Sequence, residues 1–314
     1  MKRILVTGSN GQIGVELVPH LRKLYGAENV LATARRKVSG PVSEGGPFAL
    51  LEVRDGKAFS DVLGSFRADT VIHLAGVLSA KGEADPVASW DINVNGTCVA
   101  LEAARERGAA FFFPSSIAAF GPSTPSKNTP QDTIQRPTTV YGVAKVSMEL
   151  LCDYYPLKSG MDTRGLRFPG LISYEALPGG GTTDYAVHIY YEALKKGRYT
   201  SYIARNTYMD MMYMPDALDA VARLMEADPA KLVHRNAFNI SAMSFEPEQI
   251  AASIRKLMPS FTMDYDVDPL RQRIAESWPD SLDCTAARRE WGFEPKYDLD
   301  RMTADMLARL KERI

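Results

Sequence analysis

The feature that most constrains the fold of this chain is a glycine-rich segment near its N-terminus. An apolar run at residues 4–6 leads directly into Gly8, Gly11 and Gly14. Where a buried strand enters a helix through such a turn, glycines permit the tight bend, close approach of a ligand and close helix–strand packing. The free N–H groups at the helix start can then bind a phosphate. The segment therefore predicts a strand–turn–helix unit that binds the pyrophosphate of a dinucleotide.

The predicted phosphate-binding turn also includes Asn10, Gln12 and Ile13. The alternative is a tight turn without a ligand, because a glycine pattern of this kind is weak evidence on its own. The flanking strand and helix are those that dinucleotide binding requires, so we favour binding. Pro19 lies inside the predicted helix and should kink or interrupt it.

Strand-like and helix-like segments alternate through the first half of the chain. Alternation at this spacing predicts an α/β fold of Rossmann type, a doubly wound and mainly parallel sheet with helices on both faces. The predicted strands span residues 2–7, 30–34, 48–53, 70–75, 110–114 and 163–168. The predicted helices span residues 11–25, 56–66, 86–107 and 139–156.

The pattern changes after about residue 170. Helices are expected near Thr183 and Pro215, and several short ones follow in the proline-rich stretch after residue 246. We interpret this part as a smaller, mainly helical domain that closes over the strand ends, where an open α/β sheet binds its ligand. The expected domains are a dinucleotide-binding domain, 1–170 with about 205–240, and a substrate-binding domain, 171–204 with 241–314.

Residues at the ends of other predicted strands could also contact the dinucleotide. The second strand ends at Ala34, where an acid that binds ribose hydroxyls is expected, and Arg35 and Arg36 follow. The two arginines either accept a 2′-phosphate or are simply solvated. Asp55 either meets the adenine amine or caps a helix. After the fourth strand come Leu74, Ala75 and Gly76. These residues either let the backbone pass close to the cofactor or form a turn without a ligand.

A second motif lies far downstream, at Tyr141 and Lys145. At this spacing a phenol and an ammonium lie on the same face of a helix. A free tyrosine titrates at about pH 10, so a base at neutral pH needs about 4 kcal/mol of phenolate stabilisation. Lys145 and a positive nicotinamide ring can supply this in a partly dry site. The alternative is an ordinary amphipathic helix, against which the upstream glycine turn argues.

Ser116 ends the fifth predicted strand, at the expected edge of the ligand crevice. Its hydroxyl can donate to a substrate oxygen while Tyr141 takes the proton. The alternative is a hydroxyl that caps local backbone, the role expected of Ser115. Taken together, Ser116, Tyr141 and Lys145 predict a nicotinamide-dependent enzyme that uses a tyrosine for proton transfer.

The composition excludes several other classes of protein. A formal net charge of −1 offers no attraction to nucleic acid or an anionic membrane. No apolar run approaches the roughly 18 residues of a membrane span. The 3 cysteines and 4 histidines have neither disulfide-framework nor metal-ligand spacing, so no metal is expected. The N-terminal apolar run is too short for a signal peptide, and a reducing cytoplasm is expected.

The two motifs resemble those of the extended short-chain dehydrogenases, a superfamily that includes nucleotide-sugar epimerases and dehydratases. That group commonly has an asparagine after Arg-Tyr-Phe past the sixth strand, where this chain reads Arg-Phe-Pro-Gly at 167–170. It also has a later Arg-Asp-Phe/Tyr segment whose arginine meets a diphosphate, where this chain reads Met-Asp-Met at 209–211. Both differences count against a sugar nucleotide.

The same regions resemble the short-chain type of L-threonine 3-dehydrogenase, and the similarity covers essentially the whole chain. The most specific segment is Gly-Gly-Gly-Thr-Thr-Asp-Tyr-Ala at 179–186, and Met-Met-Tyr-Met at 211–214 is expected to be a core strand. The resemblance implies NAD, oxidation of L-threonine at its 3-hydroxyl to 2-amino-3-oxobutanoate, and Tyr141 as the base. A nucleotide-sugar epimerase or dehydratase and a non-catalytic redox sensor are the alternatives. A homodimer is compatible with the sequence.

The carboxylate of such a substrate is expected at the glycine-rich string. No arginine is an obvious partner, but a helix that begins at about Thr183 offers free N–H groups. Gly180, Thr182 and Thr183 are therefore the predicted substrate-binding residues, and the glycines would let this segment close over the substrate. A flexible connector capped by a threonine is the alternative, and Ser79 is the next candidate for the carboxylate.

Overall fold

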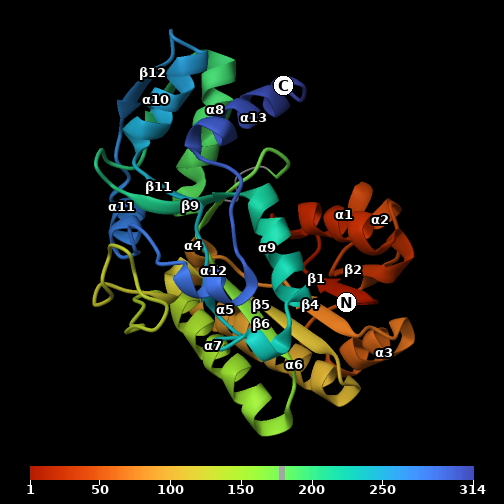
Figure 1. Cartoon of the computed structure of the whole chain (residues 1–314). Helices are drawn as coiled ribbons and strands as arrows, with labels where there is room; N and C mark the ends of the chain where they lie inside the picture. The colour runs from red at the N-terminus through yellow and green to blue at the C-terminus, as the bar shows by residue number, and fades with distance from the viewer. Residues whose placement is uncertain (177–180) are drawn as a thin grey trace.

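The computed structural model describes residues 1–176 and 181–314. Its main element is a seven-stranded sheet with the order β10-β6-β5-β4-β1-β2-β3 (Figure 1). Every pairing in this sheet is parallel, and the strand order runs outward in both directions from the centre. This topology confirms the predicted doubly wound α/β fold. The strands are β1 (Ile4–Thr7), β2 (Val30–Ala34), β3 (Phe48–Leu50), β4 (Thr70–His73), β5 (Ala110–Ser116), β6 (Thr163–Phe168) and β10 (Phe238–Asn239).

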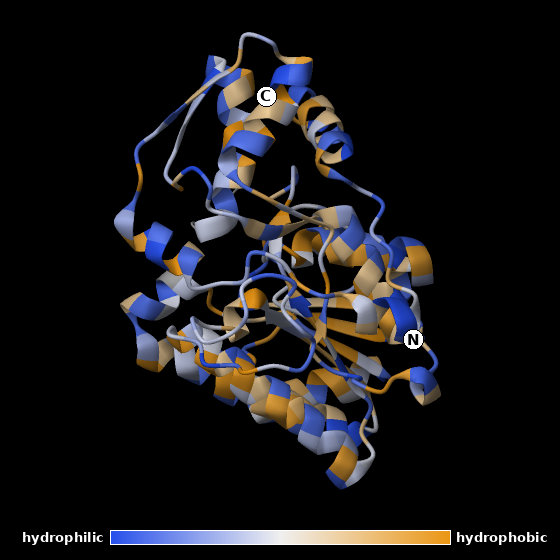
Figure 2. Cartoon of the chain, turned by 60° about the vertical axis from the view of Figure 1, so that its left-hand side comes forward, coloured by the Kyte–Doolittle hydropathy of each residue, from blue (hydrophilic) through white to orange (hydrophobic). Residues whose placement is uncertain are grey.

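Two layers of apolar side chains join the sheet to helices on its opposite faces. Because side chains alternate along a strand, Ile4 and Val6 belong to one layer and Leu5 to the other. Burial on both faces explains why the strands of this sheet are mainly orange in Figure 2. The helices of the first layer are α1 (Gly14–Tyr25) and α9 (Met214–Glu226), and those of the second are α3 (Gly56–Phe66), α6 (Gly96–Arg107) and α7 (Val140–Ser159).

Several predicted boundaries are corrected by the structure. The first helix begins at Gly14 rather than at residue 11, and it continues through Pro19 without interruption. A proline removes only one intrahelical hydrogen bond, and the fully buried Leu17 and Leu21 on either side hold this helix against the sheet. The third strand stops at Leu50 rather than at residue 53 because its partner β2 ends opposite Leu50.

The C-terminal part forms a second core above the strand ends (Figure 1). It contains two small sheets besides its helices. β9 (Met209–Tyr213) pairs with β7 (Gly170–Ile172) and β11 (Met243–Phe245), and β8 (Arg198–Ser201) pairs with β12 (Thr262–Tyr265). β9 is fully buried, as expected for the methionine-rich segment, whereas α9 and β10 return to the main sheet. The proposed domain boundaries stay a prediction.

The remaining helices are short or belong to the C-terminal part. They are α2 (Pro41–Glu44), α4 (Ser79–Ala84), α5 (Pro86–Trp90), α8 (Tyr185–Lys196), α10 (Pro247–Leu257), α11 (Pro269–Glu276), α12 (Thr285–Trp291) and α13 (Leu299–Lys311). The predicted helix 86–107 consists of α5, a π-helical turn at Asp91–Asn95 and α6.

Candidate active site

The glycine-rich turn joins β1 to α1 with very little free space. Gly8 has a φ angle of +64°, and a Cβ atom there would lie 2.6 Å from the Ala75 nitrogen. A Cβ atom on Gly14 would lie 2.6 Å from the Gly8 carbonyl oxygen. Only glycine fits at either position, which is the backbone geometry that close approach of a pyrophosphate requires. The turn therefore fits a dinucleotide.

Other predicted cofactor residues of this turn connect it to neighbouring elements. The Asn10 side-chain amide donates to the Arg36 carbonyl at 2.9 Å, so the turn lies beside the end of β2 and the exposed Arg35. Gln12 Nε2 lies 3.4 Å from the Leu171 carbonyl oxygen, which connects the turn to β7.

Ile13 precedes the first residue of α1. The Asp55 carboxylate accepts a hydrogen bond from the Ala58 N–H at 3.0 Å and caps α3. The capping role that the sequence left open is therefore present, and contact of Asp55 with adenine stays a prediction.

The segment after β4 passes directly beside the glycine turn. Leu74 and Ala75 are the backbone neighbours that a Cβ atom on Gly8 would strike. Asn93, which the sequence analysis missed, holds this segment through both its amide atoms. It accepts from the Val77 N–H at 2.7 Å and donates to the Val77 carbonyl at 3.0 Å. A Cβ atom on Gly76 would lie 3.0 Å from Asn93 Oδ1. The available signal was a row of polar residues one helical turn apart, Ser89, Asn93 and Thr97, all of which are buried.

The structure brings Ser116, Tyr141 and Lys145 together. Ser116 is the last residue of β5, and α7 begins one residue before Tyr141, with the Thr139 hydroxyl as its N-terminal cap. The Lys145 Nζ donates to the Pro114 carbonyl at 2.5 Å and lies 5.2 Å from the centre of the Tyr141 ring. The end of β5 and the first turns of α7 thus bring the three side chains into one compact group.

Burial dominates the electrostatics of this group. It raises the pKa of Tyr141 to about 12, against the lowering effect of a hydrogen bond with Ser116. It also lowers the pKa of Lys145 to about 8, while the negative charge of Glu149 acts in the opposite direction. A phenol with this pKa is protonated at neutral pH, so use as a base requires further positive charge at the site.

Of the two serines of β5, Ser116 makes both the contact with Tyr141 and the backbone cap that the sequence left open as its alternative, whereas Ser115 has a different partner from the one expected. The Ser116 oxygen accepts a hydrogen bond from the Ala118 N–H at 3.2 Å, besides its bond with Tyr141. Ser115 was expected to cap local backbone, which is wrong: its hydroxyl donates to the Glu149 carboxylate on α7. Ser115 points away from Ser116 because successive strand residues face opposite sides of the sheet.

The predicted substrate residues lie at several places near the strand ends. Thr182 and Thr183 lie in a 3₁₀ turn, Thr182–Asp184, and α8 follows from Tyr185 rather than from Thr183. The Thr183 side chain lies beside Gly170, two residues beyond the β6 residue that pairs with Ser116.

Ser79 is the first residue of α4 and is buried. Gly180 lies outside the described residues. The role of these residues in substrate binding stays a prediction.

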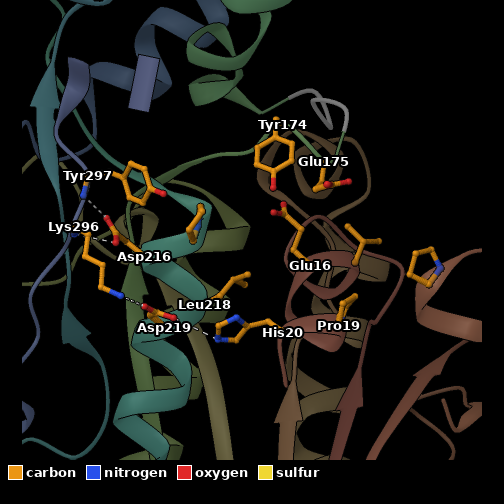
Figure 3. Close-up of a pocket in the computed structure, with 13 residues that line it drawn as sticks. Glu16, Pro19, His20, Tyr174, Glu175, Asp216, Leu218, Asp219, Lys296 and Tyr297 are labelled. Carbon is orange, nitrogen blue, oxygen red and sulfur yellow. Dashed lines mark hydrogen bonds and ion pairs between the residues drawn. The ribbon is translucent and has the colours of Figure 1, made fainter. Parts of the chain in front are cut away.

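A separate pocket of about 500 Å³ lies between α1 and α9 and contains none of the predicted site residues (Figure 3). Asp219 of α9 lies 2.6 Å from Lys296 Nζ and 3.5 Å from Nε2 of His20 on α1, so it connects the two walls. On the α1 side, Glu16 and Tyr174 point toward each other (Figure 3). The Ser173 hydroxyl donates to Glu16 and accepts from the Glu175 N–H, so α1 is tied to the segment that precedes residue 177.

The Glu16 carboxyl makes stability depend on pH. Burial raises its pKa to about 7, and the charge of Glu175 raises it further, while Ser173 and Arg313 oppose the shift. The folded state therefore holds a proton that the unfolded state releases, so stability should fall as pH rises from about 5 to about 8. Glu16→Gln, which stays neutral, should raise the melting temperature at pH 8 by several degrees and leave it nearly unchanged at pH 5.

Calorimetric melting curves at the two pH values test this expectation. The exposed Glu44→Gln is the matched control and should shift neither value. Equal effects of Glu16→Gln at both pH values would contradict the raised pKa.

Within residues 1–176 and 181–314, no cluster of three His, Cys, Asp or Glu side chains could hold a metal ion. No helix in the same residues is long and apolar enough to cross a membrane.

Comparison with known proteins agrees with the fold. A doubly wound sheet with this glycine turn is typical of proteins that bind a dinucleotide. The chain belongs to the NAD dependent epimerase/dehydratase family, whose model matches residues 4–241.

Relatives and solved structures match over almost the full length. An uncharacterized epimerase/dehydratase of Staphylococcus haemolyticus is 58% identical over 100% of this chain and 99% of its own length. The structure of L-threonine dehydrogenase from Clostridium difficile is 59% identical, with a TM-score of 0.98, over 100% of this chain and 98% of that one. The L-threonine dehydrogenase of Phytophthora infestans is 48% identical, with a TM-score of 0.96, over 100% of both chains. The expected resemblance to L-threonine dehydrogenases is therefore confirmed.

Proposed function

We propose that this chain oxidises L-threonine at its 3-hydroxyl to 2-amino-3-oxobutanoate with NAD as the cofactor. The observation that carries the proposal is the half-buried group of Ser116, Tyr141 and Lys145 in a chain similar over its full length to L-threonine dehydrogenases. A cytoplasmic location and a homodimer belong to the same proposal.

In this reaction Tyr141 takes the proton of the substrate 3-hydroxyl onto its phenolate oxygen. Ser116 donates a hydrogen bond to the same substrate oxygen and so limits the charge that develops there. Lys145 stabilises the phenolate through its positive charge and binds the cofactor ribose. The turn formed by Gly8, Gly11 and Gly14 would hold NAD, which would supply the acceptor for the hydride from substrate C3.

The alternative within the family, a nucleotide-sugar substrate, is disfavoured by what replaces its binding residues. Met209 and Met211 are fully buried in β9 and carry no cation for a diphosphate. Arg167 is held in an ion pair with Glu149 at 2.9 Å and is not available to a ligand.

The deciding experiment follows the absorbance of reduced nicotinamide when L-threonine is added with NAD or NADP. We expect turnover with L-threonine, a higher kcat/KM with NAD than with NADP, and no conversion of nucleotide sugars. Because Ala34 stands where the acid is expected, and Arg35 and Arg36 follow it, the preference for NAD should be modest. Conversion of a nucleotide sugar would favour the epimerase alternative, and NAD binding without turnover would favour the redox sensor.

The proposed carboxylate site is tested by Thr183→Ala. Loss of one hydrogen bond to a charged group costs roughly 1.5–3 kcal/mol, so the KM for L-threonine should rise about 10- to 100-fold. The affinity for NAD should stay nearly unchanged, because Thr183 lies beside Gly170 rather than at the glycine turn. The exposed Thr262→Ala in β12 is the control. Unaltered kinetics in both Thr183→Ala and Thr182→Ala would move the carboxylate to Ser79.

A further inference from the structure

A buried carboxylate lies directly behind the proposed catalytic group. Glu149 is on α7, four residues after Lys145 and eight after Tyr141, so all three lie along one face of the helix. Its side chain is only 3% exposed. Neither the sequence analysis nor the proposed reaction gave this residue a role.

The Glu149 carboxylate holds three elements around the strand end that carries Ser116. Arg167 of β6 donates to it through Nε at 3.0 Å and Nη2 at 2.9 Å. The Ser115 hydroxyl of β5 and Gln135 Nε2, the latter at 2.7 Å, also donate to it. Because Ser115 and Ser116 are adjacent in the chain, the contact of Ser115 with Glu149 restrains the position of the Ser116 backbone.

The negative charge of Glu149 also acts on Lys145, whose pKa it raises against the effect of burial. The only hydrogen-bond acceptor of Lys145 among the described residues is the Pro114 carbonyl, which is neutral. His73, which faces Lys145 from β4, has its pKa lowered to about 3 by burial and carries no charge at neutral pH. The titratable or charged groups that surround Lys145 and Glu149 are Tyr141, Cys152, Asp153, His73 and Arg167.

We propose that Glu149 is a positioning residue for the proposed reaction, which orients Ser116 through Ser115 and keeps the Lys145 ammonium charged beside Tyr141. A buried ion pair alone is weak evidence for stability and is often replaceable by apolar side chains. Here the carboxylate lies on the same helix as Tyr141 and Lys145 and accepts a hydrogen bond from Ser115 of β5. Its charge can therefore act on Lys145, and its contact with β5 can fix the position of Ser116. The inference rests on the proposed function.

The experiment compares Glu149→Gln with Glu149→Asp. The amide keeps the acceptor oxygen but removes the charge, so Lys145 loses its ammonium more readily and the Tyr141 phenolate is less stabilised. The acid limb of the kcat–pH profile should move up by about one unit, with about a tenfold loss of kcat at neutral pH. The KM for NAD should change little. Glu149→Asp retains the charge, so its acid limb should lie at the same pH as in the wild type.

A purely structural role of Glu149 would lower the thermal stability and kcat at every pH without moving the acid limb of the kcat–pH profile, and that result would overturn the proposal.

If Glu149→Gln does not fold, Ser115→Ala tests the proposal in its place. Its kcat should fall several-fold while the affinity for NAD stays unchanged, and a wild-type kcat would contradict the proposal. A readout independent of L-threonine is the Lys145 ¹³Cε NMR titration, assigned with Lys145→Arg. Its midpoint should fall in Glu149→Gln even if the wild-type chain acts on another substrate.

Discussion

Tyr141→Phe is expected to abolish turnover while the affinity for NAD survives. Phenylalanine preserves the packing of the ring on the first turn of α7 but removes the phenol oxygen that lies beside Ser116 and Lys145. Loss of a general base typically costs about 10²–10⁴ in rate. The loss should lie in kcat, because the Tyr141 hydroxyl acts on proton transfer in the transition state and not on binding of the substrate in the ground state.

Steady-state kinetics with L-threonine and calorimetric titration with NAD measure the two parts of this prediction. Tyr154→Phe is the matched control, since Tyr154 lies on the same helix but is 50% exposed. It should keep full activity. A Tyr141→Phe variant within a few-fold of the wild type would remove Tyr141 from the mechanism.

The features that could be predicted from the sequence are those set by local pattern. Buried parallel strands are continuous apolar runs, so Ile4–Thr7 and its neighbours were recognisable, and the glycine spacing located the turn. The Tyr141 and Lys145 spacing placed both residues on one face of α7. Strand ends were less predictable because they depend on the partner: β3 stops where β2 stops.

Features held by long-range pairing could not be predicted. The strands of the small sheets are short, and β7 pairs with β9, which lies about 40 residues later in the chain. Glu149 has the local pattern of any polar helical residue, and only the folded chain brings Arg167 and Ser115 to it. Asn93 likewise gains its role from Val77, from which α4 and α5 separate it in the chain. Local periodicity carries no information about such partners.

Gly8→Ala is expected to lower both stability and NAD affinity. Two costs combine at this position. A residue with a side chain pays about 1–2 kcal/mol in the left-handed region, and Gly8 has a φ of +64°. The new Cβ atom would also lie 2.6 Å from the Ala75 nitrogen and 2.7 Å from the Leu74 carbonyl carbon. These are backbone atoms, so they cannot move aside as a flexible side chain would.

Gly108→Ala separates the two costs. Gly108 has a φ of +65°, nearly the same as Gly8, but a Cβ atom there would meet nothing within 4 Å. It should therefore show only the left-handed penalty and bind NAD normally. Gly8→Ala should add roughly 1–3 kcal/mol of overpacking and displace the backbone that faces the pyrophosphate, with at least a tenfold weaker NAD affinity. Denaturant unfolding and calorimetric NAD titration of both variants give the comparison. If the two variants lose equal stability and both bind NAD normally, the close contact between the turn and Ala75 has no part in cofactor binding.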